Sequence, residues 1–424
     1  MEPIEPESPK PSKGRRRVGR VLATVVALII GVVYIALTID AVFGNGGKPL
    51  TTLSPHGVQS QYIQTLITPV YAIAGVVMVG VFGAVFFIAW RFRDKGDDEG
   101  EFPTQLEGNT KLELTWTLLP LLILAVVAVG TVATIVKLNQ TNKNALRVEV
   151  TGQQWWWSFH YDMDNNGAYT QTAKGDIITA NEMIIPVHRQ VALTITSNDV
   201  IHSFWIPALN GKKDAVPGQH HPLLIEGNTI GVYRGQCTQF CGLSHANMRM
   251  IVRVVSQADF DKWVANQQQK SAVPTPGTEA AAGLAVFKGQ LCSSCHLIRG
   301  VNDAKIAAGS AKKLLVSGVA PDLTHIATRG TFAGSIFNLY DPSNPEAPSQ
   351  PGDPNNLSLA GNPGGALYGG DSAPFNFNST ALQAWIRNPP AELPESAATH
   401  RGMPNLHLSE TQIAQLVAYL ETLK

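Results

Sequence analysis

Two long segments of this chain carry almost no charge, and they constrain its fold more than any other feature. Residues 62–90 and 114–138 are each long enough to cross a bilayer, which requires about 20 apolar residues. Trp90 and Trp116 lie near their ends, where tryptophan favours the membrane interface. A buried core helix is the alternative, but uncharged runs of this length argue against it. We therefore predict two transmembrane helices.

The charges around these segments predict their orientation. The short loop between them begins Arg91-Phe-Arg-Asp-Lys95, and basic loops tend to stay in the cytoplasm. Everything after Leu138 is then outside. An earlier apolar run, residues 18–42, follows a basic cytoplasmic N-terminus, residues 1–17, and is either a signal peptide or a further transmembrane helix. Both alternatives leave the later spans with the same orientation.

The rest of the chain is long enough for two further domains. The chain has 424 residues, and its formal net charge of zero argues against a nucleic-acid partner. Residues 144–266 contain short alternating segments typical of strands, which predict an all-β sandwich. Residues 267–278 are polar and contain proline, and we interpret them as a flexible to semi-extended linker.

One loop of the predicted sandwich has the composition of a metal site. The segment Cys237-Thr-Gln-Phe-Cys241-Gly-Leu-Ser-His245-Ala-Asn-Met248 places two thiols, an imidazole and a thioether within twelve residues. These soft ligands suit copper, and His202, at the end of a predicted strand, can add a second imidazole. A structural Cys2His2 zinc site is the alternative, but such a site has no use for the methionine.

A second motif lies beyond the linker. Cys292-Ser-Ser-Cys295-His296 is the attachment pattern of a c-type haem, in which both thiols bond to the haem and the imidazole binds the iron. Residues 279–424 resemble a cytochrome c domain, and that layout favours Met403 as the sixth ligand. The competing candidates are His325, His400 and His407. A loop rich in Pro, Gly, Asn and Ser, residues 340–374, is interpreted as an insertion in this domain.

The cysteine loop and the upstream Asp199-Val-Ile-His202-Ser-Phe204 resemble the CuA site of cytochrome c oxidase subunit II. The resemblance implies a dinuclear copper centre with bridging thiolates, imidazoles, a thioether and one main-chain carbonyl as ligands. In this sequence these are Cys237, Cys241, His202, His245, Met248 and the carbonyl of Gln239. Many family members have Glu at the last position, and its replacement by a neutral amide puts in doubt the magnesium ion that this Glu helps to bind.

Two more segments resemble subunit II. Gly152-Gln-Gln-Trp-Trp-Trp-Ser158 is similar to an aromatic cluster over the copper, which implies that electrons enter at Trp155. Packing is the alternative, and it must hold for at least one of these tryptophans because neighbours on a strand face opposite ways. Leu112-Glu-Leu-Thr-Trp resembles the start of the second membrane helix, which implies that Glu113 lies at the mouth of a proton channel. A solvated carboxylate favoured by the helix dipole is the alternative.

Together these features resemble subunit II of a caa-type cytochrome c oxidase with a fused cytochrome c domain. The expected fold is multidomain: N-terminal transmembrane helices, an all-β cupredoxin-like sandwich and a C-terminal all-α cytochrome c domain. The expected place is the bacterial plasma membrane, with both metal domains on its outer face. The implied route takes electrons from the fused haem c, or a donor cytochrome, through CuA to the oxygen-reducing, proton-pumping subunit I.

The resemblance also implies partners and leaves two alternatives. The expected partners are subunits I and III in the membrane, and cytochrome c or a cytochrome bc complex as the electron donor. One alternative is a CuA-bearing subunit of a nitric oxide reductase, which would share the copper loop. The other is a membrane-tethered copper carrier without turnover, against which the haem motif argues because a carrier has no need of a haem.

Overall fold

The computed structural model of the protein describes residues 50–93, 107–164, 175–303, 320–340, 377–394 and 401–424, and isolated helical positions from Ile29 to Ile39. The predicted N-terminus, most of the apolar run at 18–42 and nearly all of the insertion at 340–374 lie outside the described residues.

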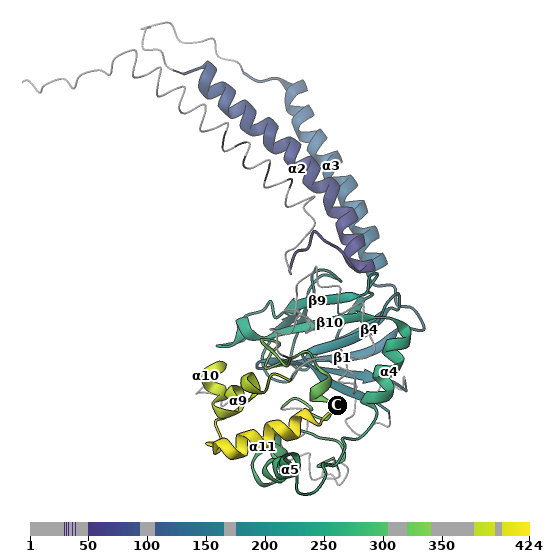
Figure 1. Cartoon of the computed structure of the whole chain (residues 1–424). Helices are drawn as coiled ribbons and strands as arrows, with labels where there is room; N and C mark the ends of the chain where they lie inside the picture. The colour runs from purple at the N-terminus through teal and green to yellow at the C-terminus, as the bar shows by residue number, and fades with distance from the viewer. Residues whose placement is uncertain are drawn as a thin grey trace, which may run out of the picture. The chain divides into compact units, whose positions relative to one another are not determined.

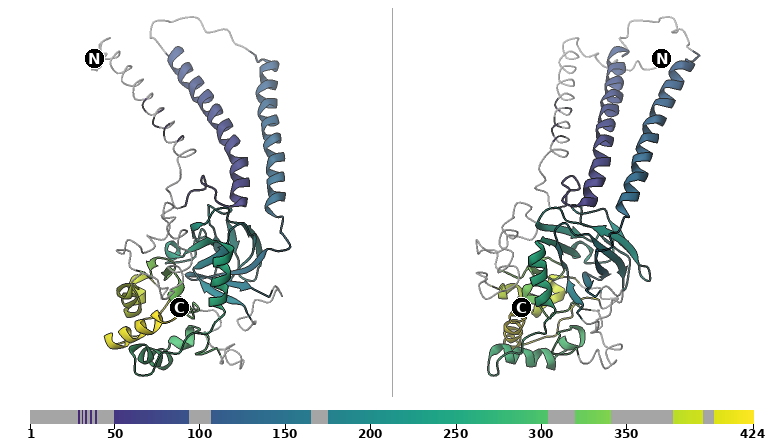
Figure 2. Two further views of the ribbon diagram at one scale, coloured as in Figure 1. Left: turned by 45° about the vertical axis from the view of Figure 1, so that its right-hand side comes forward. Right: turned by 90° about the vertical axis from the view of Figure 1, so that its right-hand side faces the viewer.

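The two predicted spans lie within two long helices, α2 (Val58–Arg91) and α3 (Thr110–Leu138), which run side by side (Figures 1 and 2). The helix α3 begins at Asn109, whose side chain accepts a hydrogen bond from the backbone N–H of Leu112 at 3.1 Å. No residue of α3 is buried within the described structure. Apolar surface of this extent requires lipid or other membrane subunits to cover it.

A β-sandwich follows the helices. Its larger sheet has the order β3-β2-β1-β5-β8, and a smaller sheet has the order β4-β10-β9. The strands of the larger sheet are β1 (Leu146–Gln153), β2 (Trp156–Asp162), β3 (Ile177–Ala180), β5 (Val191–Ser197) and β8 (His221–Ile225). Those of the smaller sheet are β4 (Glu182–Pro186), β9 (Gly231–Gln236) and β10 (Arg249–Val255).

The sandwich core lies between the two sheets and is apolar because alternate residues of each strand face it. In β1, Leu146, Val148 and Val150 are buried while Arg147 is exposed. Trp157 is fully buried and packs edge to face on Phe204. A short hairpin of β6 (His202–Phe204) and β7 (Lys213–Ala215) projects beside the sheets, and α4 (Gln257–Gln267) follows β10.

The C-terminal domain is helical and has its own core. Its helices are α5 (Glu279–Gly289), α6 (Cys292–Cys295), α9 (Ser379–Arg387), α10 (Pro389–Glu392) and α11 (Glu410–Glu421). A 3-10 turn, η3 (Ile326–Thr328), and a small hairpin of β11 (Thr331–Phe332) and β12 (Phe337–Asn338) complete its described part. The helices α5 and α11 pack at Gly283, where an added Cβ would lie 1.9 Å from the carbonyl oxygen of Gln415. The predicted fold class is confirmed, with β11 and β12 as a minor addition to the helical domain.

Candidate functional site

The loop 237–248 is fixed at both ends by strands. The strand β9 ends just before Cys237, β10 begins just after Met248, and the backbone N–H of Cys237 donates to the carbonyl oxygen of Met248 at 2.9 Å. The hairpin strand β6 is joined to the same loop, because Thr238 N–H donates to the Ser203 carbonyl oxygen at 3.0 Å. This pairing brings His202 to the loop although it is 35 residues from Cys237 in sequence.

The structure brings all six predicted copper ligands together. The two sulfur atoms of Cys237 and Cys241 are 3.8 Å apart, and Cys241 Sγ is also 3.8 Å from Met248 Sδ. The Nδ1 atoms of His202 and His245 lie 4.0 Å from Cys237 Sγ and 3.5 Å from Cys241 Sγ, respectively. The carbonyl oxygen of Gln239 lies 3.2 Å from Cys237 Sγ. Sulfur and imidazole donors at such short separations are of the kind that soft metal ions bind.

Burial and charge tune this cluster. His202, Cys237, Cys241 and Met248 are all buried, so water has little access to the sulfur atoms. The hydrogen bond with the Cys241 thiol lowers the pKa of Cys237 to about 4, whereas the same contact raises the pKa of Cys241. The lowered pKa favours the thiolate form of Cys237, which is the form that binds a cation.

A carboxylate that sequence reasoning did not assign orients His202. Asp199 Oδ1 lies 2.8 Å from His202 Nε2, which leaves Nδ1 of that ring directed at Cys237. Burial alone would raise the pKa of Asp199, but hydrogen bonds from His202 and from the backbone of Gln154 and Val200 lower it overall. The signal was present in the sequence as an aspartate three residues before the histidine.

Trp155 contacts the main chain of the loop 237–248, which is called the copper loop below. Both the indole Nε1 of Trp155 and the amide Nε2 of Gln154 donate to the carbonyl oxygen of Cys241, at 3.1 Å and 2.7 Å, respectively. Gly242 permits this approach because an added Cβ would lie 3.0 Å from both side chains, and its φ of 118° favours glycine. Trp155 and its neighbour Trp156 are each 8% exposed.

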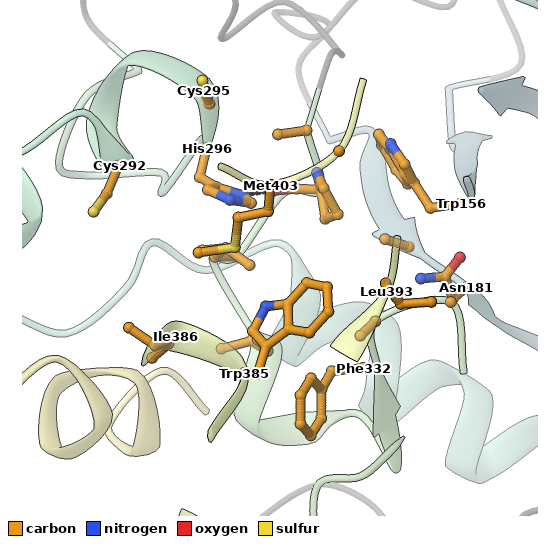
Figure 3. A pocket seen from close by; sticks show the side chains of 18 of the residues that line it. Trp156, Asn181, Cys292, Cys295, His296, Phe332, Trp385, Ile386, Leu393 and Met403 are labelled. Carbon is orange, nitrogen blue, oxygen red and sulfur yellow. Dashed lines mark hydrogen bonds between the residues drawn. The ribbon is translucent and has the colours of Figure 1, made fainter. Parts of the chain in front are cut away.

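The segment Cys292-Ser-Ser-Cys295-His296, called the haem motif below, borders a cavity of about 640 Å³. Cys292, Cys295, His296 and Met403 all line it, and Figure 3 shows His296 and Met403 reaching into it. His296 Nδ1 lies 2.8 Å from the Pro321 carbonyl oxygen, which leaves Nε2 available for a metal. Burial lowers the pKa of His296, which favours the neutral ring that ligates iron. The other walls are mainly apolar, with Phe287, Phe332, Leu382, Trp385, Ile386, Leu416 and Leu420.

Of the competing histidines, the two that the structure describes, His325 and His407, do not line this cavity. In His325, Nδ1 lies 2.9 Å from the Lys424 carbonyl oxygen and Nε2 lies 3.0 Å from that of Gln269, so both ring nitrogens face the main chain. His407 is exposed. His400 lies outside the described residues.

The sandwich contributes part of the cavity wall, which sequence reasoning missed. Seven of its residues line the cavity: Gln153, Gln154, Trp155, Trp156, Ala180, Asn181 and Ser244. The tryptophan that contacts the copper loop therefore also borders the space that the haem motif faces. Only the fold could reveal this, because Trp155 and Cys292 are more than a hundred residues apart in sequence.

Glu113 lies far from the predicted copper ligands in sequence. It is in the first turn of α3. Its Oε1 accepts from the backbone N–H of Asn109 at 3.3 Å, an arrangement that stabilises a helix N-terminus. This contact agrees with the solvated-carboxylate interpretation and does not test a role in a proton channel.

Comparisons with known proteins match these observations. Residues 146–255 match the model of the family "Cytochrome C oxidase subunit II, periplasmic domain", and residues 54–133 match the transmembrane domain of the same subunit. Cytochrome c oxidase subunit 2 of Alkalihalophilus pseudofirmus is 30% identical over 387 residues, which cover 89% of this chain and 92% of that protein. The same subunit of Bacillus sp. strain PS3 is 28% identical over 395 residues, with 89% and 93% covered.

The chain is also similar to the crystal structure of the periplasmic domain of subunit II of cytochrome oxidase from Bradyrhizobium japonicum. The identity is 30%, the TM-score is 0.27, and the match covers 30% of this chain and 97% of that one. The alignment with the Alkalihalophilus protein spans nearly the full length of both chains. This chain therefore belongs to the cytochrome c oxidase subunit II family, as a membrane-anchored component of an oxidoreductase complex with a periplasmic cupredoxin-like domain.

Proposed function

We propose that this chain is the subunit through which electrons enter a haem-copper terminal oxidase. Electrons would pass from a haem c in the C-terminal domain, or from a donor cytochrome, to a dinuclear copper centre in the sandwich and then to subunit I. The single observation that carries this proposal is that two thiols, two imidazoles and a thioether converge, through contacts of 4.0 Å or less, where the loop 237–248 meets His202 of β6.

The donor set favours copper over zinc. Copper bound here would supply a centre that changes by one electron. The Cys237 and Cys241 sulfurs are close enough to serve two metal ions at once, and Met248 Sδ adds a weak soft donor that zinc does not need. Asp199 would hold the His202 ring in place, and burial would exclude water from both sulfurs.

The C-terminal cavity supports the haem assignment. A haem c would supply a second one-electron centre. Cys292 and Cys295 are free thiols on the cavity wall, in the order that covalent attachment requires, and His296 presents Nε2. Met403 would be the second residue to hold the iron, because it reaches into the same cavity, whereas His325 and His407 do not. The apolar walls would keep water from the iron.

The same proposal covers the partners. Membership of the subunit II family supports assembly with subunit I, and we add subunit III and a donor cytochrome c or cytochrome bc complex as further partners. Trp155 is assigned as the residue through which electrons reach the copper loop, because its indole bonds to the Cys241 carbonyl oxygen. Glu113 at the start of α3 is a candidate for the mouth of a proton channel in subunit I.

Metal content and spectra of the purified full-length chain test the proposal. We expect two copper ions for each haem, and an EPR spectrum in which one unpaired electron is shared equally by two copper nuclei. A spectrum from a single copper nucleus would contradict the dinuclear centre, and zinc in place of copper would contradict the electron-transfer role. Turnover of the purified complex with oxygen but not with nitric oxide would separate an oxidase from a nitric oxide reductase.

A further inference from the structure

We propose that the contact between Glu182 and Gly330 positions the haem domain on the sandwich, so that Trp155 and Trp156 form a shared wall between the haem cavity and the copper loop. The inference rests on the proposed function, since it concerns the step between the two centres. A flexible linker would let the helical domain move relative to the sandwich. We infer instead that this contact holds the helical domain in one position.

Glu182 connects the two domains through a buried carboxylate. It lies on β4 of the sandwich, and its Oε1 accepts from Nε of Arg253 on β10. Its Oε2 accepts from the backbone N–H of Gly330, in the helical domain, at 2.9 Å. The side chains of the Glu182–Arg253 pair are only 4% and 3% exposed. A buried carboxylate needs such partners, and a hydrogen bond to a charged acceptor is among the stronger ones.

Further hydrogen bonds join the same two surfaces. Each runs between the sandwich or its copper loop and the segment around β11 or the end of α10. They are Ser335 Oγ to the Asn181 carbonyl oxygen (3.2 Å), Arg249 N–H to the Gly334 carbonyl oxygen (3.1 Å) and Ser244 Oγ to the Pro394 carbonyl oxygen (2.8 Å). Ser244 belongs to the copper loop itself, so the contact extends from β4 to the metal donors.

Two glycines of the helical domain lie too close to atoms of the sandwich to carry a side chain. A Cβ added to Gly330 would lie 2.1 Å from Arg253 Nη2, and one added to Gly334 would lie 2.3 Å from the Asn247 carbonyl oxygen. Such distances require atoms to move. Glycine at these positions is therefore what allows the helical domain to sit directly on the sandwich.

The first residues of the predicted linker, residues 267–278, also form hydrogen bonds with the helical domain. Gln267 Nε2 donates to Thr328 Oγ1 at 3.1 Å, and the backbone N–H of Ser271 donates to the Arg299 carbonyl oxygen at 3.0 Å. The sequence predicted a flexible to semi-extended tether, but these polar residues make specific hydrogen bonds with the helical domain. Composition alone cannot distinguish a solvated glutamine from one that has a partner.

The docked position has a direct effect on the cavity. Asn181, next to Glu182, lines the cavity, and its Oδ1 accepts from the backbone N–H of Trp157 at 2.8 Å. A shift at Glu182 and Gly330 would therefore move the wall that Trp156 shares with the haem motif. Trp155 and Trp156 are nearly covered, so another protein has little access to them.

The test uses full-length protein and the Gly330→Ala variant. The added Cβ would lie 2.1 Å from Arg253 Nη2, so Arg253 or the whole helical domain must move away at this contact. The matched control is Gly289→Ala at the end of α5, where an added Cβ meets nothing within 4 Å. Amide hydrogen exchange is followed in the peptides that contain Gly330 and Arg249, and electron transfer from haem to copper is timed after photochemical reduction of the haem.

We expect exchange in Gly330→Ala to be about tenfold faster at both peptides, and electron transfer to be slower, while the spectra and potentials of both centres stay unchanged. Gly289→Ala should match the wild type. Glu182→Gln should act in the same direction as Gly330→Ala, because the neutral amide no longer balances Arg253. If Gly289→Ala loosens the contact equally, or if transfer in Gly330→Ala keeps the wild-type rate, the inference is overturned.

Different experimental results would contradict the proposed function and the positioning role of the Glu182–Gly330 contact. If the wild-type chain binds neither copper nor haem, the proposed function fails, and faster exchange in Gly330→Ala still shows that the contact fixes the domains. If both centres are present and Gly330→Ala changes neither exchange nor transfer, the proposed function stands and the positioning role is wrong.

Discussion

The indole Nε1 of Trp155 donates a hydrogen bond to the carbonyl oxygen of Cys241 at 3.1 Å, while the same tryptophan lines the cavity that the haem motif faces. One side chain thus bonds to the main chain of Cys241, a proposed copper ligand, and also borders the cavity that Cys292, Cys295 and His296 line. The carbonyl can accept a second bond, and it does so from Gln154 at 2.7 Å. Loss of the indole N–H would therefore leave this carbonyl oxygen with one of its two hydrogen bonds.

Replacement of Trp155 by Phe should slow electron transfer from haem to copper without changing either metal spectrum. Phenylalanine keeps an aromatic ring in the wall but removes the bond to Cys241, at a cost of about 1 kcal/mol in stability. Transfer is timed after photochemical reduction of the haem. Trp263→Phe is the matched control, since Trp263 is also buried and packs on Tyr161 and Phe260 instead. Normal transfer in Trp155→Phe would show that electrons take another route.

Replacement of Asp199 by Asn should weaken copper binding by about 10–100-fold, the usual effect of losing a carboxylate that orients a metal-ligating histidine. The amide cannot hold His202 in the same way, although the ligands themselves remain. Copper affinity is measured by competition with a chelator of known strength. Asp214→Asn is the control, because Asp214 accepts from Ser203 Oγ in the same hairpin and does not contact His202. Equal losses in the two variants would contradict an orienting role.

The sequence could indicate a cluster of soft donors because five of the six predicted copper ligands occupy one loop and only His202 lies outside it. Two cysteines, a histidine and a methionine at fixed spacing can be arranged in few ways. Strand pairing then brings His202 to the same loop. The prediction of two membrane helices succeeded for a similar reason, because long uncharged segments have few alternatives. The helices extend a few residues beyond the predicted spans, since hydropathy does not register caps such as Asn109.

The sequence could not reveal contacts that join distant segments. Nothing in the pattern around Glu182 indicates that its carboxylate would bond to Gly330, 148 residues later. A buried charge and an exposed charge look the same in a strand until the covering surface is known. The position of Trp156 on the wall of the cavity that Cys292 lines could not be predicted for the same reason, since it depends on how the domains meet.

Replacement of Gly283 by Ala should destabilise the helical domain by about 1–3 kcal/mol or more, because overpacking at a close helix contact forces the backbones apart. The added Cβ would lie 1.9 Å from the Gln415 carbonyl oxygen and 2.7 Å from Tyr419 Cβ, between α5 and α11. Thermal unfolding followed at the haem absorption band measures the change. Gly289→Ala in the same helix serves as the control. A transition temperature equal to that of the control would contradict the tight contact.

Acidification should destabilise the helical domain through His325. Burial lowers the pKa of this ring below 6.5, while the carbonyl groups of Lys424 and Gln269 and the nearby Asp322 oppose this effect and Arg299 adds to it. The unfolded state then binds the proton more tightly than the folded state. The stability that the neutral ring contributes is therefore complete at a pH above the unfolded pKa, and it is lost as the pH falls below about 6.5. A tenfold difference in proton affinity between the folded and unfolded states corresponds to about 1.4 kcal/mol of stability.

Unfolding by denaturant at pH 7.5 and at pH 5.5 checks this effect, with His325→Gln as the test variant. We expect the wild type to lose more stability than the variant on acidification, because glutamine does not titrate. His407→Gln, at an exposed position, should behave like the wild type. If His325→Gln keeps the full dependence on pH, other buried histidines such as His160 account for it.

Replacement of Met403 by Ala should remove the sulfur-to-iron absorption band in the near infrared and lower the reduction potential of the haem. A thioether stabilises ferrous iron relative to water or a nitrogen ligand, so its loss favours the oxidised state. Covalent attachment through Cys292 and Cys295 should be unaffected, and the haem should remain bound after denaturation. His407→Ala is the control, since His407 is exposed and does not line the cavity. A surviving band in Met403→Ala would show that the sulfur of another methionine binds the iron, whereas a wild type that lacks the band would point to a nitrogen ligand such as His400.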